Sequence, residues 1–185
     1  GGLMSDVNAD SGQVMDVDPS TVVAGKSLND HMTDAVAIIR ENIKLGAAVV
    51  GNAGDNTFAI YNHTNTGKKA SFVTYSGDNA DAAGQVAMQT VAFPPSFLKR
   101  DEVPQDVIDA EIATETQRAI NDGKPAEVAE KIAQGRVNKE FYQSQVLVDQ
   151  PLLTDSKKKV GEFAKESGIE IAGFRNLFVG SGSSE

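Results

Sequence analysis

The sequence predicts an α+β fold: a small antiparallel three-stranded sheet covered by helices, with a projecting antiparallel helical hairpin that forms a coiled coil. Three observations support this prediction. Short apolar runs bounded by turn residues follow one another between residues 45 and 76. Apolar residues recur at helical spacing before and after this region. A charged segment at about 104–142 carries two narrow apolar stripes, which are typical of two helices that pack on each other.

Residues 1–26 are polar and lack a periodic pattern, so we expect a flexible acidic leader there. Order is expected to begin at Ser27, which precedes Asp30 with the spacing of a capping box. The helix that follows should bury one face, because its apolar residues recur every three or four positions. These residues are Leu28, Met32, Ala35, Val36, Ile39 and Ile43.

An antiparallel meander of three strands is predicted next. Its first strand, at 47–50, is a short apolar run that ends at Gly51. Its second strand, at 58–63, is followed by a turn at 64–67 and a returning strand at 68–75. A helix should then begin with Asp78 as its N-cap and end at Pro94-Pro95, because proline cannot donate a backbone hydrogen bond.

The helical hairpin is predicted from residues that typically start and end helices. Pro104 suits the first position of a charged helix that continues to Ile120. Gly123-Lys124-Pro125 then combines a helix stop with a restart, and the second helix runs to Phe141.

We therefore expect one core over residues 27–180, with the hairpin inserted at about 104–142. After the hairpin, a short helix at 159–167 and a last strand at 169–179 should follow. The tail at 181–185 should be frayed.

Composition limits the function. The 185 residues include 17 basic and 26 acidic ones, and the net charge of −9 repels phosphate, so direct binding of nucleic acid is not expected. The absence of Cys excludes disulfides and thiolate chemistry, and 2 His disfavour a metal site. No apolar run approaches the roughly 20 residues that span a bilayer, so no membrane contact is expected. Without a visible targeting segment, we expect a cytoplasmic protein, or an organelle stroma or matrix protein whose transit peptide has been removed.

Two short motifs come near to ligand-binding loops without completing them. The segment 25–27 resembles the end of a phosphate-binding loop, but Ser20 stands where that loop needs Gly. Residues 6–10 alternate like a calcium loop, but Val17 stands where Glu is needed. His63 ends a predicted strand with no nucleophile motif near it. The residues alone thus predict no catalytic group, cofactor or metal, and favour a protein that acts by binding rather than an enzyme.

Several segments, in colinear order, resemble the translation elongation factor Ts family. EKIAQGRVNK at 130–139 is similar to the family's "EKIxxGRxxK" helix, and VLVDQPLL at 146–153 is similar to its "xLLxQPFV" stretch. NDGKP at 121–125 matches the family's "xxGKP" hairpin tip, and VAMQ at 86–89 is similar to "IAMH". The resemblance covers Leu28 to Gly180.

The resemblance implies a guanine-nucleotide exchange factor. Members of the family bind the GDP form of the GTPase elongation factor Tu, disturb its magnesium and phosphate site, and so promote GDP release during translation elongation. By linkage, a partner that prefers the nucleotide-free GTPase weakens nucleotide affinity by the same factor. The resemblance implies contacts with the GTPase at Tyr61, Asn62, His63, Met88, Gly123, Lys124, Pro125, Leu153 and Thr154.

Departures from the family pattern leave two alternatives open. The family's first three-helix domain is absent, as is its "TDFV" motif, which wedges near the magnesium site. The Arg pair of the family's "LRR" is Gly46-Ala47, and the His of "IAMH" is Gln89. We expect either the GTPase-docking fragment of an exchange factor or a diverged module. The alternative function is a non-exchanging structural or scaffold subunit, bound to a ribosome or polymerase complex through the same surfaces. The oligomeric state stays open.

Overall fold

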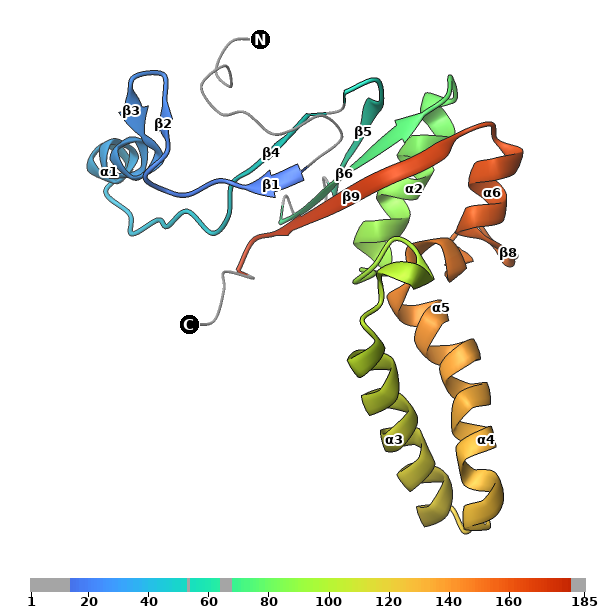
Figure 1. Ribbon diagram of the computed structural model, residues 1–185. Helices are drawn as coiled ribbons and strands as arrows, with labels where there is room; N and C mark the ends of the chain where they lie inside the picture. Colours follow the sequence, from blue (N-terminus) through green and yellow to red (C-terminus); the bar gives the residue numbers. More distant parts are fainter. Residues whose placement is uncertain (1–13, 53, 64–67, 181–185) are drawn as a thin grey trace. The chain divides into compact units, whose positions relative to one another are not determined.

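The computed structural model describes residues 14–52, 54–63 and 68–180 (Figure 1). Its helices and antiparallel strands confirm the predicted α+β class. Contacts divide the chain into two compact units: residues 1–87 with 170–185 form the first, and residues 88–169 form the second. Within the described ranges, no helix is long and apolar enough to cross a membrane.

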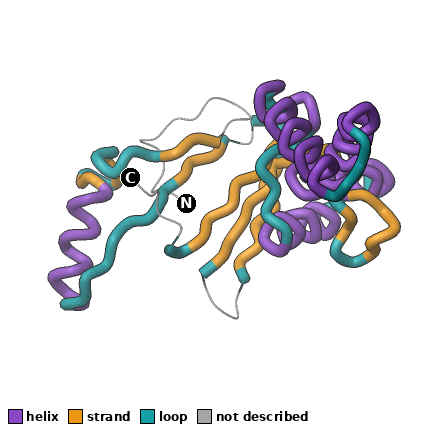
Figure 2. The backbone as a smooth tube through the Cα atoms, turned by 90° about the horizontal axis from the view of Figure 1, so that it is seen from below, coloured by secondary structure: helices purple, strands orange, loops and turns teal. Residues whose placement is uncertain are grey.

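The first unit is built on a three-stranded antiparallel sheet (Figure 2). Strand β6 (Lys69–Ser76) lies between β5 (Thr57–Asn62) and β9 (Glu170–Phe178). Val73 and Tyr75 in β6 are buried on the same face, because side chains alternate along a strand. The strands predicted over 58–63, 68–75 and 169–179 are therefore present, and the turn predicted at 64–67 lies outside the described residues.

Helix α2 (Ala80–Ala92) begins in this unit and lies along the sheet (Figures 1 and 2). Its first turns bury small side chains, including Ala83 and Ala87, which allow a helix to approach a sheet closely. Its start corrects one prediction. The backbone N–H of Ala82 donates to Asn79 Oδ1 over 3.0 Å, so Asn79 rather than Asp78 is the capping residue.

The predicted meander is wrong in its first strand. Strand β4 (Val49–Gly51) does not pair with β5 but with β1 (Val14–Asp16). Gly51 of β4 packs closely on the sheet, because a Cβ atom there would stand only 3.1 Å from Cζ of Phe58. The rings of Phe58 and Phe72 pack edge to face, with centroids 5.7 Å apart. Strand β4 thus lies against these rings instead of joining the sheet beside β5.

The predicted leader contains ordered pairs of strands. Besides β1, the short strands β2 (Val22–Val23) and β3 (Lys26–Ser27) pair with each other. Residues 1–13 lie outside the described residues. That the leader is flexible stays a prediction.

Helix α1 (Leu28–Ile39) has the predicted N-cap, because Ser27 Oγ accepts from the backbone N–H of Asp30 over 3.0 Å. The predicted face is only half-buried. The half-buried side chains of α1 are Leu28, Met32, Ala35 and Val36, which were predicted to lie on that face. No residue of α1 is fully buried, and Ile39 is 54% exposed. The helix ends at Arg40, in the left-handed region at φ 61°, so Ile43 lies beyond it. The segment 43–45 lines an open pocket together with α1 rather than sealing the helix.

The second unit consists of two longer helices and several short elements. A 3-10 turn η1 (Arg100–Glu102) leads to α3 (Gln105–Asn121) and α4 (Ala126–Arg136), and Pro104 and Pro125 directly precede the two helices. Next come a π-helical turn η2 (Val137–Phe141), α5 (Tyr142–Gln145) and the 3-10 turn η3 (Leu147–Asp149). The paired strands β7 (Pro151–Leu152) and β8 (Asp155–Lys159) and helix α6 (Val160–Glu166) complete it. The core of this unit is formed by Leu98, Val103, Val146, Leu147, Leu152, Val160 and Ala164.

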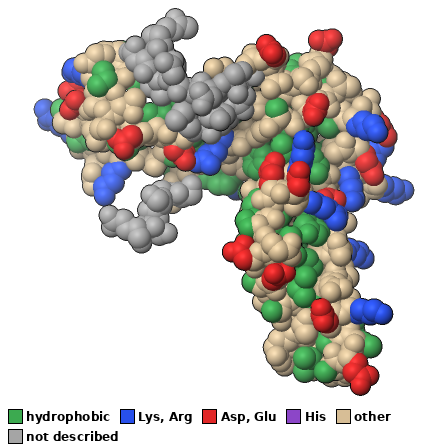
Figure 3. Space-filling view, viewed as in Figure 1, with side chains coloured by type: hydrophobic (Ala, Val, Ile, Leu, Met, Phe, Trp, Pro, Cys, Tyr) green, Lys and Arg blue, Asp and Glu red, His purple; other side chains and the backbone are tan. Residues whose placement is uncertain are grey.

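Helices α3 and α4 run in opposite directions and pack directly on each other (Figure 1). Ala119, Ala129 and Ala133 are fully buried where they meet. Such small residues let two helix backbones approach closely. Apolar side chains lie along the seam in Figure 3, with charged side chains beside them. That the pair forms a projecting coiled coil stays a prediction.

Replacing Ala133 by leucine is expected to lower the free energy of unfolding by about 2 kcal/mol, because the larger side chain cannot fit in the closed seam. The exposed Ala113 on α3 provides a matched control, and Ala113→Leu should change stability by less than about 0.5 kcal/mol. Urea denaturation followed by circular dichroism measures both. A tolerated Ala133→Leu would mean that α3 and α4 separate at little cost.

Candidate functional site

Tyr61, Asn62 and His63 lie at one end of β5 in the first unit. The Tyr61 hydroxyl and His63 Nδ1 are 3.1 Å apart and share a hydrogen bond. The backbone N–H of His63 donates to the carbonyl of Lys69 over 2.9 Å. Both rings are half-buried, whereas Asn62 is exposed. The end of β5 therefore presents one exposed amide and a fixed Tyr–His pair, a rigid polar surface suited to contact with another molecule.

Leu153 and Thr154 form the exposed turn between β7 and β8 in the second unit. The turn is held from below by Gln89, which is fully buried in α2. The backbone N–H of Leu153 donates to Gln89 Oε1 over 2.7 Å. Gln89 Nε2 donates to the carbonyl of Pro151 over 3.1 Å and to Gln150 Oε1 over 3.0 Å. The turn is thus fixed by a buried amide whose hydrogen-bonding groups are all used.

The second buried amide, Gln150, extends this network. Its Nε2 donates to the carbonyl of Phe93 over 3.0 Å and to the carbonyl of Ser144 over 3.1 Å. The end of α2, helix α5 and the β7–β8 turn are therefore joined through two glutamines. The sequence signal for this role was weak, because a glutamine in a helix is more often exposed.

An apolar groove of about 540 Å³ borders the same turn. Phe93, 52% exposed, and Leu153, 43% exposed, are the large apolar side chains on its lining, together with Pro94. No motif in the sequence indicated Phe93. Its position directly before two prolines, where a helix must end, was the signal that placed it at a surface.

The turn between α3 and α4 contains the predicted tip residues Gly123, Lys124 and Pro125, all exposed. Gly123 has φ 81°, a conformation that favours glycine, and its N–H donates to the carbonyl of Ile120 over 2.9 Å. Pro125 then directly precedes α4. These constraints present the ammonium group of Lys124 on a rigid two-helix turn.

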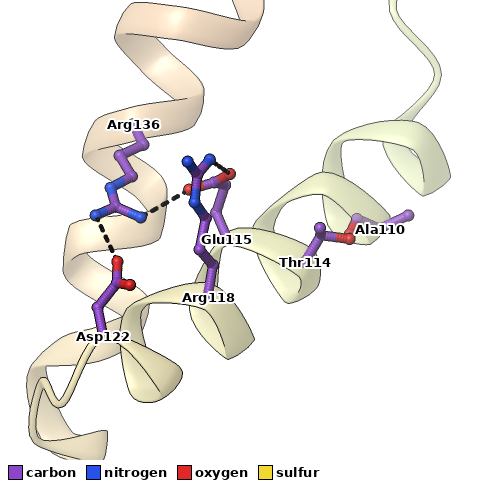
Figure 4. A network of polar contacts seen from close by, with 6 residues as sticks. All are labelled: Ala110, Thr114, Glu115, Arg118, Asp122 and Arg136. Carbon is purple, nitrogen blue, oxygen red and sulfur yellow. Dashed lines mark hydrogen bonds and ion pairs between the residues drawn. The ribbon is translucent and has the colours of Figure 1, made fainter.

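A charged network joins α3 to α4 behind this tip (Figure 4). Arg136 Nη1 donates to Glu115 Oε2 over 2.9 Å, and Arg118 Nη1 donates to Glu115 Oε1 over 3.1 Å. Arg136 also reaches Asp122 at 3.5 Å. The hydrogen bond from Arg136 holds the pKa of Glu115 below its usual value, although desolvation opposes the change. The network fixes the register of the two helices next to the buried alanines.

Asp149 organises a second charged cluster in the same unit. Arg100 donates to both of its carboxylate oxygens, from Nε over 2.6 Å and from Nη2 over 3.0 Å. Lys159 Nζ donates to Oδ1 over 2.9 Å. The Arg100 guanidinium lies 4.3 Å from the centre of the Tyr142 ring. We call these four residues the Asp149 cluster.

The pKa of Asp149 is lowered by this cluster. Burial alone raises that pKa, but the hydrogen bonds from Arg100 and Lys159 together outweigh the effect of burial. The carboxylate is therefore charged in the folded protein at neutral pH, and the cluster joins η1, η3 and β8.

The predicted contact residues fall in both units. Tyr61, Asn62 and His63 belong to the first unit, and the tip residues with Leu153 and Thr154 belong to the second. Met88, half-buried, begins the second unit beside Gln89. In the described part of the chain, no three His, Asp or Glu side chains gather as a metal ion would require.

Comparison with known proteins places this fold in a family. The family model described as Elongation factor TS matches residues 4–181. An elongation factor Ts of Saccharopolyspora erythraea is 38% identical over 162 residues, which cover 84% of this chain and 58% of that protein. One from a Hydrogenobaculum species is 34% identical over 88% of this chain and 59% of its own length. A mitochondrial elongation factor Ts of Ostreococcus tauri is 35% identical over 85% of this chain and 48% of its own length.

These matches define a chain with the fold of a translation elongation factor, and the chain belongs to the elongation factor Ts family. It spans between about half and three-fifths of the length of the curated relatives it matches.

Proposed function

We propose that this chain is the GTPase-docking part of a guanine-nucleotide exchange factor, which binds elongation factor Tu in its GDP form and promotes GDP release. The observation that carries the proposal is the match of the family model over residues 4–181. It is supported by the exposure of the β7–β8 turn and of Lys124, two places where the family resemblance implies contact with the GTPase.

The physical logic is linkage between two binding sites on the GTPase. A protein that binds the nucleotide-free form more tightly than the GDP form weakens GDP binding by that ratio. The supporting features on this chain are preformed: the β7–β8 turn is fixed by Gln89, and the end of β5 is fixed by the Tyr61–His63 hydrogen bond. Rigid contact residues lose little conformational entropy on binding.

We further propose that the α3–α4 pair is a projecting coiled coil that makes additional contacts with the GTPase. The charged network around Glu115 supports this, because it holds the two helices in one register without using the side chain of Lys124. Exposed residues Gly123 to Pro125 then remain available to a partner.

The chain is expected to bind elongation factor Tu but to accelerate GDP release only weakly, because the "TDFV" wedge is missing from this sequence. Stopped-flow release of a fluorescent GDP analogue measures the rate, and calorimetry with the same GTPase measures the affinity. Release as fast as with a full-length family member would contradict the weak-exchange prediction. Binding with no acceleration at all would favour the scaffold alternative.

Replacing His63 by alanine is expected to weaken binding to the GTPase by about 5–30-fold, or about 1–2 kcal/mol, if this ring is a central contact. Tyr61→Phe is the control, because it removes the hydroxyl that holds His63 while leaving the imidazole in place. Its effect should be smaller. Thermal melts should move little for either variant. Unchanged affinity in His63→Ala would show that the His63 ring makes no contact with the GTPase.

A further inference from the structure

Basic side chains gather in one pocket of the first unit, although the chain as a whole carries a net charge of −9. The pocket has a volume of about 440 Å³ and lies where the end of β5, the start of β6 and the end of β9 meet the segment 44–47. Its basic lining residues are Lys44, Lys68, Lys69 and Arg175. No acidic residue of the described ranges lines it. We call this site the basic pocket.

Only some of the basic side chains of the pocket form ion pairs within the described part of the chain. Arg175 forms an ion pair with Asp16 of β1, so one acid at the margin neutralises one of the four cations. Lys69 lies over the ring of Phe178, 5.6 Å from its centre, and is exposed. Within the described part of the chain, neither Lys44 nor Lys69 has an ion-pair partner. A surplus of positive charge therefore remains at the mouth of the pocket.

The remaining lining is typical of a site for polypeptide. Asn62 supplies an exposed amide that can both donate and accept hydrogen bonds. Leu177 and Val179 supply apolar wall, and Val179 is 72% exposed. A partner polypeptide with carboxylates and apolar side chains could therefore place its carboxylates beside the lysines and its apolar side chains against Leu177 and Val179.

Nucleic acid fits the basic pocket less well. Single-stranded nucleic acid is held by open aromatic faces on which bases stack, but the aromatic ring of the pocket, Phe178, is half-buried and covered by Lys69. A long polyanion also extends from the pocket over the acidic surface of the chain, whereas a short acidic segment stays near the lysines of the pocket, because charges beyond a Debye length of about 8 Å are screened.

We propose that the basic pocket binds an extended acidic segment of a partner polypeptide, with its carboxylates beside Lys44 and Lys69 and its apolar side chains against Leu177 and Val179. This contact goes beyond nucleotide exchange, although Asn62 is also one of the proposed GTPase contacts. Its test requires no GTPase. Failure of the exchange proposal would therefore leave it standing, and the reverse also holds.

The test is a titration of the full chain with a short acetylated peptide of glutamates with leucine at every fourth position. Amide NMR signals of Asn62, Ala70 and Leu177 report binding. Three other ligands are compared: the same peptide with glutamine in place of glutamate, a uridine oligonucleotide of equal charge, and inorganic phosphate. The double variant Lys44→Glu/Lys69→Glu removes the available cations. Lys131→Glu/Lys139→Glu, exposed on α4 and η2, is the matched control with the same change in net charge.

We expect saturable shifts at these amides with the glutamate peptide, weakened at least about tenfold in Lys44→Glu/Lys69→Glu and hardly in the control. Raising the salt concentration should weaken binding as well. Lys44→Gln/Lys69→Gln should weaken binding of the glutamate peptide to a smaller extent. This variant replaces the charge-reversed one if charge reversal disturbs folding. Absence of saturation, equal binding of the glutamine peptide, tighter binding of RNA or phosphate, or equal weakening in the control would each overturn the proposal.

Discussion

Replacing Gln89 by alanine is expected to lower the free energy of unfolding by about 3–4 kcal/mol. The substitution removes one buried and two part-buried hydrogen bonds and leaves Gln150 Oε1, the Pro151 carbonyl and the Leu153 N–H without their partner. It also opens a cavity at a fully buried position. Urea denaturation followed by circular dichroism measures the loss.

Two further variants separate the causes. Gln89→Met keeps most of the volume but none of the hydrogen bonds, so its loss of stability should exceed half that of Gln89→Ala if the polar network is the main stabilising factor. Gln117→Ala, exposed on α3, is the control and should change stability by less than about 0.5 kcal/mol. If Gln89→Ala is as stable as this control, the buried network contributes nothing measurable.

Replacing Asp149 by alanine is expected to cost about 2–3 kcal/mol of stability at neutral pH. The variant leaves Arg100 and Lys159 facing each other without the carboxylate that both of them bind. The side chain of Asp149 is only 10% exposed, whereas Arg100 is 44% exposed and can regain water, which keeps the loss below that of a fully buried pair. Asp101→Ala removes an exposed acid nearby and should have little effect.

The same aspartate makes stability depend on pH. Because the pKa of Asp149 is lower in the folded state than in the unfolded chain, the unfolded state binds the proton first as the pH falls. The contribution of Asp149 is therefore complete above about pH 5 and is lost on acidification through its folded pKa. Glu115 acts with the same sign. Between about pH 5 and 3, the free energy of unfolding of Asp149→Asn should depend less steeply on pH than that of the wild type. Identical slopes would contradict the assignment.

Local signals were sufficient to predict much of the fold. Pro104, Pro125 and Gly123 act through backbone geometry alone, so both ends of α3 and the start of α4 follow from them. The end of α4 at Arg136 does not, since the second helix was predicted to run to Phe141. Ser27 caps α1 for the same reason. Long-range features were harder. Strand β4 pairs with β1 and its Gly51 packs on the ring of Phe58, and both are contacts between distant segments that no local pattern encodes.

In the candidate site, too, local motifs were predictable from the sequence and long-range contacts were not. The family motifs indicated Leu153 and the tip residues, and the structure leaves these positions exposed. The buried support beneath Leu153 was not predictable, because Gln89 and Gln150 meet from segments 61 residues apart. Strand β8 was also missed, since its lysines lack the apolar alternation of a half-buried strand and pair only because the β7–β8 turn brings them there.

The amide at position 89 makes the β7–β8 turn insensitive to protonation near neutrality. A histidine there, as in the family motif, would change charge around its ordinary pKa of about 6.5 and lose its acceptor when protonated. The carboxamide of Gln89 does not titrate, and it offers the Leu153 N–H the same acceptor in mildly acidic and mildly alkaline solution. In this chain the hydrogen bond that holds the exposed turn at Leu153 therefore stays the same when the pH changes around neutrality.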